Sequence, residues 1–140
     1  METESTKNIF NSEKIIKHLI KSSDNDYKTM LSLFESKHYN WTLFIGHLVI
    51  EKLLKAYYVK VNNEHPPLIH NLLRLAQKSK IKLDQEQEDF LAEVTKFNIN
   101  VRYNDYKLAF YKKCTKKYTE IWFNKIKNYR LWIKKKLMSL

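Results

Sequence analysis

Residues 41–61 read WTLFIGHLVIEKLLKAYYVKV, a stretch in which apolar side chains occupy most positions. A helix that is apolar around most of its circumference lies in the middle of a bundle. We therefore expect residues 38–62 to form a central helix that ends before the Pro66-Pro67 pair. Gly46 lowers helix stability by about 1 kcal/mol relative to Ala, so a neighbouring helix or a dimer partner should approach closely there.

The rest of the chain carries weaker helical signals on both sides of this stretch. Apolar residues at alternating steps of three and four predict one long helix over residues 12–36. Further helices are predicted over residues 69–78, from residue 84 to about 97 and from about residue 115, while residues 98–105 break the pattern. The prediction is an all-α, antiparallel four- to five-helix up-and-down bundle.

Composition agrees with a single helical domain. The 140 residues include one Gly and two Pro, too few for a hairpin-rich fold. We expect one domain over residues 11–140 after a flexible N-terminus at residues 1–10. The single Cys114 excludes an intramolecular disulfide and a thiolate zinc site. No apolar run reaches the roughly 18 residues of a membrane span, and the polar N-terminus does not resemble a signal peptide, so we expect a cytoplasmic protein.

Positive charge is concentrated at the C-terminal end of the chain. The formal net charge is +11, and residues 107–140 hold ten Lys, Arg130 and a single acid, Glu120. Such a field attracts polyanions such as nucleic acid. The other interpretation is that these lysines only solvate the outer face of the last helix.

The first candidate constellation lies on the central helix. His47, Glu51, Lys55 and Tyr58 are spaced four, four and three apart, so they share one face. Glu51 and Lys55 form a plain surface pair in the simplest interpretation. In the functional one, the polar stripe faces a cleft, because polar groups on an otherwise apolar helix are costly to bury without partners.

The second constellation is the stretch RYNDYK, which holds Arg102, Tyr103, Asp105, Tyr106 and Lys107. A guanidinium offers a rigid fork for phosphate, and tyrosine rings offer stacking faces for bases. Asp105 would orient Arg102 in this interpretation. In the alternative, the Arg and the Asp pair with each other and fasten the segment to the bundle.

Two histidines, His65 and His70, flank the Pro pair. They lack a nearby third ligand, so their spacing does not match a metal site, and we expect neither a metal nor a cofactor. We expect His70 to begin the third helix and to hydrogen-bond a carbonyl or a carboxylate. A single glycine excludes a phosphate-binding Gly loop.

The stretches FIGHLVIEKLLKAYYVKVNNEHPPLIHNLLRLA and FNINVRYNDYKLAFYKKCTKKYTEIWFNKIK together resemble a prokaryotic HEPN domain. The resemblance extends from about Ser22 to Lys136. Its most specific parts are Glu51-Lys52 with Lys55-Ala56, the Pro-Pro-x-x-His turn that ends at His70, and Arg102-Tyr103-x-Asp105-Tyr106.

This resemblance implies a helical bundle that pairs into a homodimer, with the Arg-bearing segment lining a cleft near the dimer axis. Family members bind nucleotides or RNA. Many are metal-independent ribonucleases of toxin-antitoxin or defence systems, and many are encoded beside a minimal nucleotidyltransferase that can act as the antitoxin. The chain departs from the ribonuclease pattern, an Arg followed after four to six residues by His, because Lys107, Leu108 and Ala109 occupy those positions.

Three hypotheses follow for function, and none of them assigns a catalytic residue firmly. The first is a binding module that holds a nucleotide or RNA for a partner nucleotidyltransferase. The second is a metal-independent endoribonuclease in which His47 or His70 replaces the missing histidine beside Arg102. The third is an interaction protein whose lysine face docks an acidic partner. The candidate binding residues are Arg102, Tyr103, Asp105, Tyr106, Lys107, His47, Glu51, Lys55 and His70.

Overall fold

The computed structural model describes residues 10–140, and all regular structure in that range is helical. The helices are α2 (Ser12–Glu35), α3 (Tyr39–Asn62), α4 (Leu72–Lys78), α5 (Gln85–Arg102), α6 (Asn104–Lys113) and α7 (Lys116–Met138). The predicted all-α bundle is confirmed. Most of the expected flexible N-terminus, residues 1–9, lies outside the described residues.

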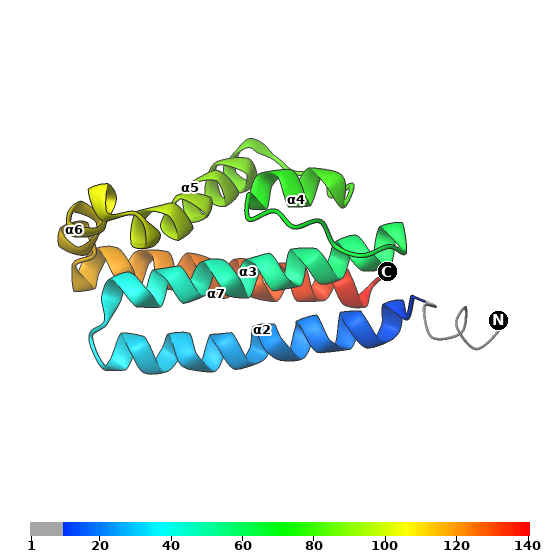
Figure 1. The fold of residues 1–140 in the computed structure, drawn as a ribbon, viewed down its shortest axis with the longest axis horizontal. Coiled ribbons are helices and arrows are strands. Elements are labelled where there is room, and N and C mark those ends of the chain that lie inside the picture. The colour runs from blue at the N-terminus through cyan, green and yellow to red at the C-terminus, as the bar shows by residue number, and fades with distance from the viewer. Residues whose placement is uncertain (1–9) are drawn as a thin grey trace.

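Helix α3 is the centre of the bundle, as its apolar circumference predicts. It packs against α2, α4, α5 and α7 (Figure 1). Seven of its apolar side chains are at most 1% exposed: Leu43, Val49, Ile50, Leu53, Leu54, Ala56 and Val59. Helices α2 and α5 run antiparallel to α3, and α7 runs alongside it in the same direction. The start of α3, the end of α5, α6 and the start of α7 therefore gather at one end of the bundle.

Aromatic and ionic side chains tie the outer helices to one another. Phe90 of α5 stacks on Tyr129 of α7, and Phe97 meets Trp122 edge to face with ring centroids 5.5 Å apart. Asp24 of α2 accepts hydrogen bonds from Arg130 and Lys134 of α7. These contacts hold α5 and α2 against α7 on opposite sides of α3.

Two helix boundaries differ from those predicted. Helix α5 continues to Arg102 and α6 begins at Asn104, so the predicted break over residues 98–105 is wrong except at Tyr103. The helix persists because Val101, one turn after Phe97, is also buried and extends the apolar stripe. Helix α4 begins at Leu72 instead of residue 69, because the side chain of Asn71 caps it by accepting from the backbone N–H of Arg74.

Side chains of two neighbouring helices approach α3 closely at Gly46. A Cβ atom at this position would lie 2.7 Å from Cδ1 of Ile126 in α7 and 3.4 Å from Cε of Met30 in α2. The predicted close approach is therefore made by helices of the same chain.

No helix within residues 10–140 is both long enough and apolar enough to cross a lipid bilayer.

We expect Gly46→Ala to destabilise the protein, because the new methyl group would lie 2.7 Å from Cδ1 of Ile126, and the close packing around this fully buried side chain opposes the shift it would have to make. Overpacking of this kind typically costs about 1–3 kcal/mol, more than the roughly 1 kcal/mol that Ala gains over Gly in a helix. In an Ile126→Val background, which lacks Cδ1, the same change should stabilise. Urea unfolding of the four proteins measures this coupling, and equal effects in both backgrounds would contradict it.

Candidate functional site

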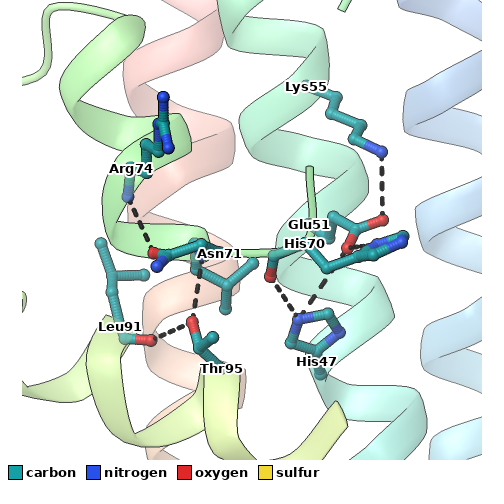
Figure 2. Close-up of polar contacts among 9 residues, drawn as sticks. His47, Glu51, Lys55, His70, Asn71, Arg74, Leu91 and Thr95 are labelled. Atoms are coloured by element: carbon teal, nitrogen blue, oxygen red, sulfur yellow. Dashed lines mark hydrogen bonds and ion pairs between the residues drawn. The ribbon is translucent and has the colours of Figure 1, made fainter. Parts of the chain in front are cut away.

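A cluster of four polar side chains lies at the middle of α3. His47, Glu51 and Lys55 come from successive turns of the helix, and His70 comes from the segment that joins α3 to α4 (Figure 2). The spacing of four places the three α3 residues on one face, as the sequence predicts. The structure thus brings four of the nine predicted site residues together.

The carboxylate of Glu51 is the hub of this cluster. Its Oε1 accepts a hydrogen bond from Nδ1 of His70 at 2.7 Å, and its Oε2 accepts one from Nζ of Lys55 at 3.3 Å. Its side chain is only 6% exposed. The predicted contact between His70 and a carboxylate is confirmed, but His70 precedes α4 and its cap, so it does not begin the helix. Because a buried charge needs partners, Glu51 ties the connecting segment to α3.

His47 is the most deeply buried residue of the cluster and contacts the backbone of the segment that joins α3 to α4. Its Nε2 donates to the backbone carbonyl of His70 at 2.9 Å, which places the proton of the neutral ring on Nε2. Burial lowers the pKa of His47, while the carbonyl of His70 and the charge of Glu51 oppose the shift. The charge of His70 and, least of all, that of Arg102 add to the lowering. Nδ1 of His47 is buried and has no hydrogen-bond partner within residues 10–140. His47 is therefore a neutral, enclosed residue.

The connecting segment is anchored at its far end as well. The backbone N–H of Leu72 donates to Oγ1 of Thr95 in α5 at 3.0 Å, and the hydroxyl of Thr95 donates to the carbonyl of Leu91 at 2.8 Å. Sequence reasoning missed Thr95. The sequence feature that could have indicated Thr95 is a hydroxyl residue in the interior of a helix. Such a hydroxyl donates to the carbonyl four residues earlier, and its oxygen can still accept a hydrogen bond from another segment.

The Arg-bearing segment lies at the junction of α5 and α6. Arg102 is the last residue of α5, and Tyr103, Asp105, Tyr106 and Lys107 lie at or near the start of α6. All five are exposed. Arg102 forms no ion pair with Asp105 or with any other residue that the structure describes, so neither predicted role of that aspartate is seen.

Arg102 nevertheless belongs to the same region as the cluster. Its positive charge is near enough to His47 to lower the pKa of that ring. No hydrogen bond or ion pair joins the remaining residues of the segment, Tyr103, Asp105, Tyr106 and Lys107, to Glu51 or His70 within the described chain. The site therefore has an enclosed polar half on α3 and an exposed half at the start of α6.

This arrangement suits anion binding and proton transfer. The free guanidinium of Arg102 can form paired hydrogen bonds with a phosphate. His70 is held through Nδ1 by Glu51, while 49% of its side-chain surface is exposed, so its second ring nitrogen is available to a ligand. No set of three or more His, Cys, Asp or Glu side chains in residues 10–140 has the geometry of a metal site.

The fold and the site define an all-α helical bundle with a buried His–Glu–Lys cluster on its central helix and a free arginine beside it. The family model described as "HEPN domain" matches residues 16–136. The chain belongs to this family. No curated protein and no solved structure matches the sequence.

The lowered pKa of His47 predicts that stability falls on acidification below about pH 6.5, the ordinary pKa of histidine. The unfolded chain takes up a proton at this pH and the folded chain does not, so protonation favours unfolding. Between the two pKa values the loss reaches at most about 1.4 kcal/mol per pH unit. Urea unfolding between pH 7.5 and 5.5 measures this slope.

The variant His47→Gln should remove most of this slope, while His18→Gln, a change at an exposed histidine of α2, should leave it unchanged. A slope that is the same in wild type and His47→Gln would show that another group controls the acid response.

Proposed function

We propose that this HEPN domain is a nucleotide- or RNA-binding module. Arg102 binds a phosphate, and the face formed by Glu51, Lys55 and His70 borders the same ligand. The observation that carries the proposal is that Arg102 is exposed and has no ion-pair partner in the described chain. An unpaired arginine that its own fold does not use is suited to an external anion.

The charge distribution supports a polyanionic ligand. Residues 107–140 carry a charge of +10, and they begin five residues after Arg102. Their field raises the local concentration of nucleic acid and speeds its association.

The proposal includes partners that the family resemblance implies. We propose that the domain forms a homodimer and is the companion of a minimal nucleotidyltransferase in a toxin-antitoxin or defence-type module. In a dimer with the Arg-bearing segments near the axis, two copies of Arg102 would face one ligand-binding cleft.

Arg102→Ala should weaken binding of labelled single-stranded RNA by at least about tenfold, the effect of losing a charge-assisted hydrogen bond, while the melting temperature stays nearly constant. Arg74→Ala, at another exposed arginine, should bind like wild type. Fluorescence anisotropy measures affinity, and thermal unfolding measures stability.

A large loss of stability with unchanged affinity would show that Arg102 is a structural residue and would overturn the proposal. Binding that depends steeply on salt and is indifferent to Arg102 would instead favour an interaction surface on the lysine face of α7.

A second candidate function, metal-independent endoribonuclease, is favoured by the Glu51–His70 pair. With Nδ1 bonded to Glu51, the neutral ring of His70 keeps a lone pair on Nε2 that can take the proton of a ribose 2′-hydroxyl. The 2′-oxygen then attacks the phosphorus, and the bond to the 5′-oxygen breaks. That oxygen takes a proton from water, which leaves a 2′,3′-cyclic phosphate and a 5′-hydroxyl. Arg102 would stabilise the charge on the phosphoryl oxygens.

If this candidate is correct, wild type cleaves RNA in EDTA, and His70→Ala loses at least about 100-fold in rate, as is usual for a general base. His65→Ala, at an exposed histidine of the same segment, should cleave normally. Gel analysis of labelled RNA measures the rates. Equal cleavage by wild type and His70→Ala would point to a contaminant, and no cleavage by wild type would leave the binding module alone.

A further inference from the structure

Helix α6 exposes large aromatic and aliphatic side chains that do not help to pack it against the bundle. Phe110 is its only buried residue. Tyr111 and Leu108 are each 64% exposed, and Tyr106 is 54% exposed. Large exposed apolar groups that gather on one short helix mark a binding surface more often than isolated ones do.

Two adjoining hollows lie between α6 and the start of α3. One has a volume of about 320 Å³ and is lined by Lys37, Tyr39, Asn40, Tyr111, Lys112, Cys114 and Thr115. The other has a volume of about 380 Å³ and is lined by Asn40, Asn104, Lys107, Leu108 and Tyr111. Asn40 and Tyr111 line both, so the hollows form one groove, which we call the α3–α6 groove.

The α3–α6 groove is basic along its whole length. Lys37, Lys107 and Lys112 line it, and none of its lining residues is acidic. Asp105 lies on the same helix but outside the lining. A groove with this charge attracts phosphates and repels a second copy of itself, so a symmetric contact between two such grooves is unfavourable.

Asn40 adds a hydrogen-bonding group to this basic groove. The residue is 8% exposed and lines both hollows. Its amide atoms are not among the fully buried side-chain atoms that lack a partner in residues 10–140, so the amide reaches solvent and is open to a ligand. Its surroundings in the groove leave the amide one donor group and one acceptor for an incoming molecule.

We propose that the α3–α6 groove binds a single-stranded nucleic acid segment. Tyr111 stacks on a base, the amide of Asn40 bonds the edge of that base, and the three lysines contact the flanking phosphates. Stacking on an aromatic ring and bonding to a base edge both require an unpaired base. A duplex hides its base faces, so the groove selects single strands.

This inference rests on the proposed function and extends it along the strand. Asn104 in the groove is two residues from Arg102, and Asn40 precedes His47 by two turns of α3, a rise of about 10 Å. A strand whose base occupies the groove can therefore place its next phosphate near Arg102. The groove supplies recognition of the base, and Arg102 supplies recognition of the phosphate.

The experiment compares binding of a labelled 12-nucleotide RNA, the same sequence as single-stranded DNA, and the same RNA annealed to its complement as a blunt-ended duplex. We expect the single strands to bind at least about tenfold more tightly than the duplex. Tyr111→Ala should weaken single-strand binding by about 5- to 100-fold, the range for loss of one stacked base. Asn40→Ala should weaken it by about 2- to 10-fold, the range for loss of one neutral hydrogen bond. Equal affinity for RNA and DNA would show that the groove recognises only bases and phosphates. Tighter binding of RNA would show that it also contacts the 2′-hydroxyl groups.

Tyr111→Phe keeps the ring and should bind like wild type, and Leu131→Ala, at an exposed residue of α7, is the control outside the groove. Circular dichroism verifies that each variant is folded. Equal binding of duplex and single strand, or normal binding by Tyr111→Ala and Asn40→Ala, would overturn the groove proposal.

Which variants lose affinity distinguishes failure of the groove proposal from failure of the proposed nucleic-acid-binding function. If only Arg102→Ala loses affinity, the domain binds nucleic acid but not through the groove. If wild type binds none of the probes, both proposals fail.

Discussion

The buried carboxylate of Glu51 is the constraint from which the rest of the site follows. An unpaired charge in a helical core is strongly unfavourable, and here Lys55 and His70 supply the partners. The bond to His70 fixes the segment after α3, whose other end is held by Thr95 of α5. Helix α5 in turn ends at Arg102. The bond between Glu51 and His70 and the bond between Leu72 and Thr95 thus join α3 to α5, the helix that ends at Arg102. Arg102 is the residue that we assign to the ligand.

Charge decides which hollow of the molecule faces a polyanion. A hollow of about 490 Å³ between α5 and α7 is lined by three acids, Glu86, Asp89 and Glu93, against one base, Lys125, so its net negative charge disfavours phosphates. The smaller hollows beside α6 are lined by lysines and no acids. Because these hollows differ in the sign of their charge, a polyanion is attracted to the hollows beside α6 and repelled by the one between α5 and α7. Volume alone would favour the acidic hollow.

Helices were predicted correctly from the sequence where buried apolar residues recur with a helical period, and they were missed where this period is interrupted or absent. The central helix followed from its apolar circumference, and a bond from His70 to a carbonyl or a carboxylate was expected because His65 and His70 lack the third ligand of a metal site. Residues 98–102 were misjudged because Asn98, a polar residue, lies in the buried stripe. Helix α6 has one buried residue, so it leaves no apolar period to detect. The meeting of Asn40 with Tyr111 joins residues 71 positions apart, and only the folded chain reveals it.

If nucleic acid binds where α6, the start of α3 and Arg102 meet, it should perturb the backbone amides of these segments. Amide NMR spectra of the labelled protein, recorded during titration with a short single-stranded RNA, would show this. We expect the chemical-shift changes to concentrate at Asn40, at residues 102–113 and at His70. Changes confined to the lysine-rich outer face of α7, with those residues unaffected, would contradict this expectation.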